Sequence, residues 1–345
     1  MSLESLPTAS LYAICFALGI LPVGALLLAL LLLDSYKLVR LRTVLAVLGT
    51  GAAVALVCLV LNPWLQRALG LDSGSFIRYV APLVEEALKG TVILAMLALR
   101  RLGFLVDAAI FGFAVGAGFA TVENIHYTLV LADPDLAIWT IRGFGTAVMH
   151  GGATAVLAIV AKALSERLDS EGPLVFLAGL LPAYLMHSLF NQFLLSPSLT
   201  TMGLLISLPV MFLLVFQASE RALHGWLGIG FDTDQLLLQA IHEGRVRETR
   251  AGRYLEALKT RFPPASVVDM LCYLRLHLEL SIRAKGVLLM QRAGFDAPPD
   301  PEVEARLREL AYLERSVGRT GMLALSPILN MSRRDLWQFH MLGRR

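Results

Sequence analysis

The sequence predicts an all-α protein: a polytopic membrane bundle of about seven transmembrane helices with a C-terminal soluble helical domain. Three observations lead to this prediction. Hydrophobic residues make up 56% of the 345 residues, charged residues make up 17%, and the mean hydropathy is +0.66, a balance typical of membrane-spanning chains. Seven apolar runs reach the roughly 20 residues that a spanning helix needs. The density of charged residues also rises near Glu220.

The seven apolar runs differ in what they carry. The predicted spans are 10–33, 43–62, 79–99, 104–129, 139–163, 173–195 and 200–219. The first two contain no acidic or basic side chain, so we expect them only to anchor the chain. The next four carry polar residues away from their ends. A charge at the bilayer centre costs about 3 kcal/mol on insertion scales, so these residues are functional candidates.

The charge pattern divides the chain into a membrane bundle at residues 1–219 and a cytosolic domain at residues 220–345. The first part holds 11 Lys and Arg against 12 Asp and Glu, and the second holds 19 against 15. Helical spacing predicts cytosolic helices over 234–243, 251–261, 266–290 and 301–317, with breaks at Pro263-Pro264 and Pro298-Pro299. No catalytic motif is found there, so we expect regulation or contact with a cytosolic partner. The net charge of +3 is too small to indicate nucleic acid.

The distribution of Lys and Arg in the short loops predicts the orientation of the bundle. Basic residues follow the first, third, fifth and seventh spans: Lys37, Arg40, Arg42, Arg100, Arg101, Lys162, Arg167 and Arg221. The alternate loops carry Arg67 and Arg78, then Asp133 and Asp135, and then the nearly neutral stretch 196–198, so the pattern holds nearly throughout. The positive-inside rule therefore predicts an N-terminus outside the membrane and a C-terminus in the cytoplasm.

The third span contains two adjacent glutamates and a lysine. Glu85 and Lys89 are one helical turn apart, and Glu86 reaches Lys89 at three residues. The lysine can neutralise one carboxylate, which leaves the other available as a general base. The alternative interpretation is a salt bridge that fixes helix packing. A lone Glu/Lys pair would favour that alternative, but the additional glutamate favours a catalytic role.

The fourth span combines a small-residue face with another polar pair. Gly112, Gly116 and Gly118 allow a neighbouring helix to approach closely. Glu123 and Asn124 follow one turn later and place a third intramembrane carboxylate beside a neutral donor and acceptor.

The fifth and sixth spans contribute histidines. His150 lies in the fifth span, while His187 and Asn191 lie one turn apart on one face of the sixth. At about 1.5 Å per residue from the outer membrane surface, Glu85 and Glu123 lie roughly 9 Å deep, His187 about 12 Å and His150 about 16 Å. Four antiparallel helices therefore bring their polar residues to one layer, which predicts a shared site in the outer half of the bilayer.

In these residues the sequence resembles the PrsW family of intramembrane proteases, within the larger group that includes the CAAX prenyl proteases. The family pattern combines Glu-Glu-x-x-Lys, a Gly-rich Phe-Ala stretch ending in Glu-Asn, a lone His, and His-x-x-x-Asn. Here it corresponds, in the family's order, to Glu85 through Lys89, Gly112 through Asn124, His150, and His187 through Asn191. The resemblance covers residues 75–195. Two positions depart from the pattern: Phe111 stands where tyrosine is common, and Ala108 where glycine is common.

The resemblance implies hydrolysis of a peptide bond without a covalent intermediate. Either Glu85 or Glu86 would be the base that takes a proton from water, and His150 would help to hold that water. His187 and Asn191 would face the developing oxyanion, where fixed donors in a water-excluded site are worth most. Successive helical residues are about 100° apart, so only one of the two glutamates can point well at the histidines.

The resemblance also implies supporting residues, a substrate class and a location. Lys89 would tune the carboxylates, and Glu123 with Asn124 would support the site or bind substrate. The implied substrate is a single-span membrane protein, such as an anti-sigma factor, in a bacterial cytoplasmic membrane. No cofactor is expected.

Three alternatives use the same residues. A zinc-dependent protease would hold its metal with Glu85 or Glu86, His150 and His187, because two histidines and a carboxylate are a known catalytic zinc set. The sequence has no His-Glu-x-x-His motif, so these ligands would come from three separate helices. A proton-coupled transporter would be expected to contain inverted repeats, and no convincing repeat is found. A non-catalytic scaffold would be expected to have lost at least one key residue.

Overall fold

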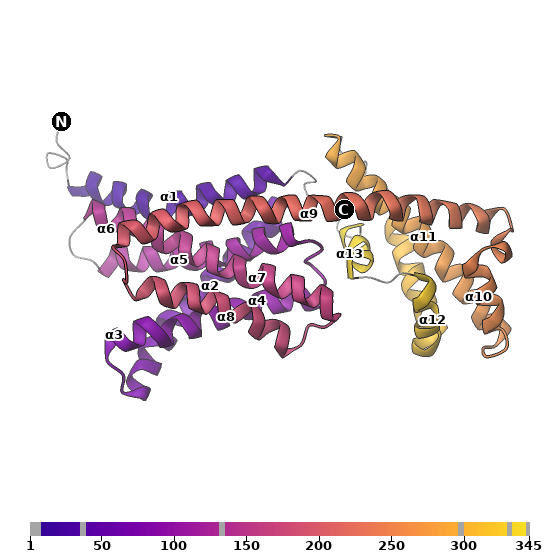
Figure 1. Cartoon of the computed structure of the whole chain (residues 1–345), viewed down its shortest axis with the longest axis horizontal. Helices are drawn as coiled ribbons and strands as arrows, with labels where there is room; N and C mark the ends of the chain where they lie inside the picture. The colour runs from indigo at the N-terminus through magenta and orange to yellow at the C-terminus, as the bar shows by residue number, and fades with distance from the viewer. Residues whose placement is uncertain (1–7, 35–38, 131–134, 296–299, 330–332, 343–345) are drawn as a thin grey trace. The chain divides into compact units, whose positions relative to one another are not determined.

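Every regular element that the structure describes is a helix (Figure 1). The structure is a computed structural model that describes residues 8–34, 39–130, 135–295, 300–329 and 333–342. Lys37, Asp133 and the predicted break at Pro298-Pro299 lie outside the described residues. The chain divides into two compact units, Met1–Ser219 and Glu220–Arg345. The all-α prediction is confirmed.

The first unit is a bundle of long helices with two π-helical turns. Its elements are α1 (Thr8–Leu33), α2 (Leu41–Leu69), α3 (Ser73–Ser75), η2 (Phe76–Val80), α4 (Ala81–Ala98), α5 (Leu105–Val130), α6 (Leu136–Ile141), η3 (Arg142–Ala147), α7 (Val148–Leu168), α8 (Pro173–Asn191) and the first part of α9 (Pro197–His242). The two π-helical turns, η2 and η3, directly precede α4 and α7. Such turns are rare and occur frequently at functional sites.

Six described segments are long and apolar enough to cross a membrane. They are Ser10–Leu33, Leu41–Leu69, Leu105–Val130, Leu136–Leu168, Pro173–Asn191 and Pro197–His242. The predicted span over 79–99 is also helical, but it carries three charged residues, Glu85, Glu86 and Lys89, within 18 residues, whereas each of the six has an apolar window of that length with at most two. The polytopic bundle is therefore confirmed, while the exact count of seven is not.

Helix α5 forms the centre of the bundle. In its most apolar stretch 83% of the residues are buried, against 22% for α1 and 28% for α2. Glycines allow this burial by bringing backbones together. A Cβ on Gly116 would lie 2.1 Å from the carbonyl oxygen of His150, and one on Gly118 would lie 2.0 Å from that of Leu48. The small-residue face read from the sequence thus packs α5 against both α7 and α2.

Replacing Gly116 with alanine is expected to destabilise the bundle. The added methyl group must displace the α7 backbone at His150, and overpacking of this kind typically costs about 1–3 kcal/mol. Thermal unfolding of the full chain in detergent measures the effect. Gly49→Ala is the matched control, because a Cβ at Gly49 meets no atom within 4 Å and alanine is the better helix former. Equal unfolding temperatures for the two variants would contradict the close packing.

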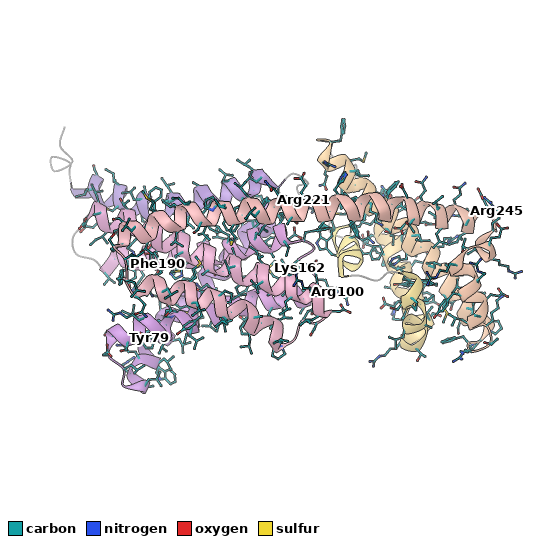
Figure 2. The ribbon with its side chains drawn as sticks, in the orientation of Figure 1. Tyr79, Arg100, Lys162, Phe190, Arg221 and Arg245 are labelled. Carbon is teal, nitrogen blue, oxygen red and sulfur yellow. The ribbon has the colours of Figure 1, made fainter. Side chains whose placement is uncertain are left out.

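Two basic residues that the charge pattern assigns to the cytoplasmic side lie at one end of the bundle. Arg100 and Lys162 lie at the same end, while Tyr79 and Phe190 lie at the opposite end (Figure 2). Arg100 and Lys162 come from two of the segments that the positive-inside rule assigns to the cytoplasmic side. The arrangement of the helices is therefore compatible with the predicted orientation, which stays a prediction.

The second unit is built around α11. The rest of α9 is followed by η4 (Val246–Glu248), α10 (Arg250–Leu258), α11 (Pro264–Arg292), α12 (Glu302–Leu329) and α13 (Arg333–Leu342). Met270, Leu274 and Leu280 of α11 are fully or almost fully buried in the core of this unit. Gly318 interrupts α12 with a non-helical φ of 69° and ψ of 170°, next to the predicted helix end at residue 317.

The largest difference between the predicted and observed spans is at the end of the last one. The last predicted span ends at residue 219, whereas α9 continues to His242. Helical hydrogen bonding does not require apolar side chains, and no proline follows Pro209 within α9. The boundary between the two units, at Ser219 and Glu220, therefore falls within α9.

Candidate active site

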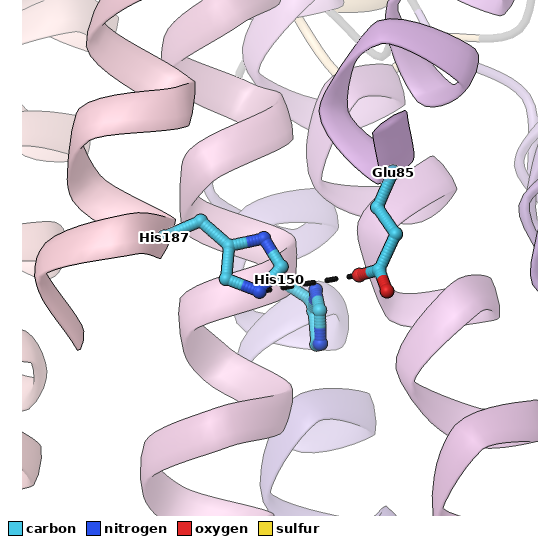
Figure 3. Close-up of side chains that lie close together, drawn as sticks. All are labelled: Glu85, His150 and His187. Carbon is cyan, nitrogen blue, oxygen red and sulfur yellow. Dashed lines mark ion pairs between the residues drawn. The ribbon is translucent and has the colours of Figure 1, made fainter. Parts of the chain in front are cut away.

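A cavity of about 500 Å³ opens among the helices that carry the predicted site residues. Its wall contains Glu85 from α4, Glu123 from α5, His150 from α7, and His187 and Asn191 from α8. Figure 3 shows the side chains of Glu85, His150 and His187 converging from their three helices. The four polar segments read from the sequence therefore meet at one place.

Glu85 is the glutamate that faces the cavity. Its Oε1 atom accepts a hydrogen bond of 2.9 Å from the Asn62 side-chain amide. Its Oε2 atom lies 3.9 Å from Nε2 of His187. That separation is too long for a direct hydrogen bond, and a single water can bridge two polar groups at such a distance. Asn62 thus fixes one oxygen of Glu85 while the other oxygen faces His187.

Glu86 points away from the cavity into the protein. It is fully buried and its Oε1 lies 2.5 Å from Nζ of Lys89 and 2.9 Å from Nδ1 of His187. Its Oε2 accepts a longer hydrogen bond, 3.4 Å, from the Thr154 hydroxyl. The turn of about 100° between successive helical residues separates the two glutamates. Glu86 therefore lies behind the histidines, where its partners occupy both of its oxygens.

Hydrogen-bond partners assign the ring protons of both histidines. Nζ of Lys89 lies 3.1 Å from Nδ1 of His150, and Oε2 of Glu123 lies 3.1 Å from Nε2 of the same ring. An ammonium group only donates, so Nδ1 of His150 accepts and its Nε2–H donates to Glu123. The Nδ1–H of His187 likewise donates a hydrogen bond to the Glu86 carboxylate. The Nε2 lone pair of His187 consequently faces Glu85.

Arg142 connects Glu123 and Asn124 at the edge of the site. Its Nη2 lies 3.5 Å from Oε2 of Glu123, and its Nε donates to Oδ1 of Asn124 at 3.0 Å. The guanidinium carbon lies 3.7 Å from the centre of the Tyr127 ring. The Asn124 amide donates to the carbonyl of Gly19 at 2.6 Å. Asn124 therefore joins α1, α5 and η3 and does not line the cavity wall.

Helix α8 also supports the π-helical turn η2. The Asn191 amide donates to the carbonyl of Ile77 at 3.0 Å, and the Ser188 hydroxyl donates to the carbonyl of Arg78 at 2.7 Å. An irregular turn leaves backbone carbonyls in need of partners within a membrane. Asn191 thus lies at the cavity wall with one of its two amide N–H groups already used.

Two residues at this site were missed by the sequence reasoning. Asn62 lies at the end of a run interpreted as an anchor, and Arg142 lies at the start of the fifth predicted span. A neutral amide near the end of an apolar run has no distinctive signature. A lone arginine inside a predicted span is the signal that could have identified Arg142.

Residues 39–216 match the model of the PrsW family intramembrane metalloproteases. The chain belongs to this family. It is accordingly an intramembrane protease, and the resemblance seen over residues 75–195 is confirmed. The PrsW match also includes α2 and therefore Asn62. Comparisons with curated proteins and with solved structures gave no match.

The PrsW family description names a metalloprotease, and three residues of the cavity wall are of the types that bind metal ions. Glu85, His150 and His187 can each offer one ligand atom, with all three atoms within 4.8 Å of one another. Two histidines and a carboxylate are ligand types that zinc binds. A histidine that binds a metal usually donates its other ring N–H to a carboxylate, as His187 does to Glu86. His150 fits less well, because the Lys89 ammonium occupies Nδ1 and leaves the ring proton on Nε2.

Proposed function

We propose that this PrsW protease hydrolyses a peptide bond of a single-span membrane protein, with Glu85 as the general base. The observation that carries the proposal is the 3.9 Å gap between Oε2 of Glu85 and Nε2 of His187 on the cavity wall. A water in that gap would donate one hydrogen bond to a carboxylate oxygen and one to a histidine lone pair. The third side of the water would face the cavity and a substrate carbonyl.

The reaction follows from these positions. Glu85 takes a proton from the water as the water oxygen attacks the carbonyl carbon of the substrate. The protonated Glu85 then gives that proton to the leaving amine, so one group acts first as base and then as acid. The second amide N–H of Asn191, which Ile77 does not use, is a donor for the oxyanion. No covalent bond to the protein forms at any step.

This division of roles differs from the expectation drawn from the family resemblance. That expectation gave the water to His150 and the oxyanion to His187. The contacts favour His187 as the partner of the water, because its Nε2 lone pair faces Glu85. His150, which lies between Lys89 and Glu123, is then a positioning residue. Glu86 and Lys89 hold the two histidines in their tautomers.

A metal is the second candidate for water activation. Glu85, His150 and His187 would hold it, and when bound it would act as a Lewis acid that lowers the pKa of water to about 7. The Lys89 ammonium argues against this arrangement, since it places a positive charge 3.1 Å from a nitrogen of His150. The donor types argue for it.

We expect proteolysis to continue after treatment with a zinc chelator. The assay uses the full chain in liposomes with a panel of single-span membrane proteins that carry a different fluorescent label at each end. Metal content of the purified protein is measured in parallel. Loss of cleavage on chelation, recovery on addition of Zn²⁺ and one bound zinc per chain would together assign water activation to a metal. Proton-coupled flux without cleavage would overturn the protease mechanism in favour of transport.

We further propose an outside N-terminus and a cytoplasmic C-terminus, with residues 220–345 available to a cytosolic partner. The support is the distribution of basic residues among the loops. In this orientation the site lies in the outer half of the bilayer. The cut in the substrate should then map nearer the extracytoplasmic end of its span.

A further inference from the structure

Two residues that line the cavity each carry a buried polar atom without a hydrogen-bond partner among the described residues. These atoms are the acceptor Oδ1 of Asn62 and the donor Nη2 of Arg142. Buried polar groups in native proteins are almost always paired, so each exception calls for an explanation. Here Oδ1 of Asn62 has no hydrogen-bond partner, and Nη2 of Arg142 has only an ion-pair contact of 3.5 Å with Glu123.

Neither atom is free to turn away. The Asn62 Nδ2 atom donates to Glu85 at 2.9 Å, which fixes the amide plane and therefore the direction of Oδ1. The Arg142 guanidinium is fixed by its Nε bond to Asn124 and by its stacking on Tyr127. Its Nη2 lies within ion-pair distance of Glu123, at 3.5 Å, without making a hydrogen bond to it. Both atoms are thus held in place before any ligand binds.

The substrate of an intramembrane protease has a matching requirement. A helical span hides its peptide bonds, so the segment to be cut must unwind before water can reach a carbonyl. Each unwound residue then exposes one N–H donor and one C=O acceptor. Lipid cannot satisfy these groups, so the protein around them must do so.

We infer that Asn62 and Arg142 form a binding site for the extended backbone of the substrate. Oδ1 of Asn62 accepts a hydrogen bond from a peptide N–H close to the cut, and Nη2 of Arg142 donates to a peptide carbonyl. The inference rests on the proposed function and deepens it. Because it uses only backbone groups, the site recognises an unwound segment without regard to its side chains.

An ester scan of the substrate tests the Asn62 contact. The substrate is a synthetic single-span peptide that the wild type cleaves, and each residue flanking the cut is replaced in turn by its hydroxy-acid analogue. This change converts one N–H into an ester oxygen. We expect the wild type to lose about tenfold in kcat/KM at one flanking position. The Asn62→Leu variant should show no further loss at that position.

The comparison is made within each enzyme preparation, so a fraction of unfolded protein cancels from the amide-to-ester ratio. Thr50→Val is the matched control, because Thr50 lies on the same helix, donates a hydrogen bond to the carbonyl of Val47 and does not line the cavity. This control should retain the wild-type ester penalty. Arg142→Lys, which keeps the charge but loses the planar fork, should raise KM more than it lowers kcat.

Two failures can be told apart. If the wild type cleaves and Glu85→Gln does not, the proposed function stands. An ester penalty of the same size in Asn62→Leu as in the wild type at every position would then overturn the backbone site alone. If the wild type shows no Glu85-dependent cleavage of any panel protein or peptide, the proposed function is wrong and this inference falls with it.

Discussion

Replacing Glu85 with glutamine is expected to lower kcat by about 10²–10⁴-fold, the range that general acid-base catalysis contributes. Glutamine keeps the size of the side chain and an oxygen for the Asn62 amide, which contacts Glu85 in the native protein. It cannot take a proton from water. Cleavage of a labelled single-span substrate in liposomes measures the loss. Since binding groups are unchanged, KM should stay within about threefold of the wild type.

The control for this variant is Glu220→Gln, which makes the same chemical change at an exposed position on α9. It should cleave at the wild-type rate. Thermal unfolding should show that Glu85→Gln is as stable as the wild type, because neutralising a carboxylate in an apolar bundle removes a desolvation penalty. A Glu85→Gln variant that still cleaves would show that another group is the base. Glu86 does not line the cavity, so Glu123 would then be the remaining carboxylate able to act as the base.

The sequence predicted the convergence of polar residues because depth along a helix follows from residue number. Glu85, Glu123, His150 and His187 lie at comparable distances from the ends of four antiparallel apolar runs. The structure brings these four residues to one cavity. The sequence also predicted the helices themselves, because an apolar run long enough to cross the bilayer must pair its backbone groups internally.

The rotation of each helix about its axis could not be predicted in this way. Whether Glu85 or Glu86 faces the cavity depends on how α4 packs against its neighbours, and both glutamates lie in similar sequence surroundings. The partner of Glu85 was also hidden, because Asn62 is one neutral residue in a run of aliphatic ones. Depth is a local property of the sequence, whereas rotation is set by long-range packing.

Packing also explains why a charge can remain deep in this bundle. Lys89 and Glu86 are both fully buried, and their charged atoms lie 2.5 Å apart. Nζ of Lys89 additionally contacts His150 and lies 4.4 Å from the centre of the Phe119 ring. The two histidines depend on this pair for their tautomers. The pair therefore links the stability of α4 to the arrangement of the site.

Lys89→Met is accordingly expected to destabilise the protein by about 3–5 kcal/mol, the usual effect of removing one partner from a buried ion pair. The loss arises because the variant leaves the Glu86 carboxylate buried with only neutral partners. Denaturation of the full chain in detergent micelles measures this loss.

The double variant Glu86→Gln/Lys89→Met should recover more than half of the lost stability, since it removes both charges. It should nevertheless remain nearly inactive, because His187 loses its carboxylate partner. Arg67→Met, at an exposed position on α2, should be close to the wild type in stability. If Lys89→Met and the double variant were equally unstable, lost packing and not an unpaired charge would be the cause, and Lys89 would act mainly as a space-filling residue beside Phe119.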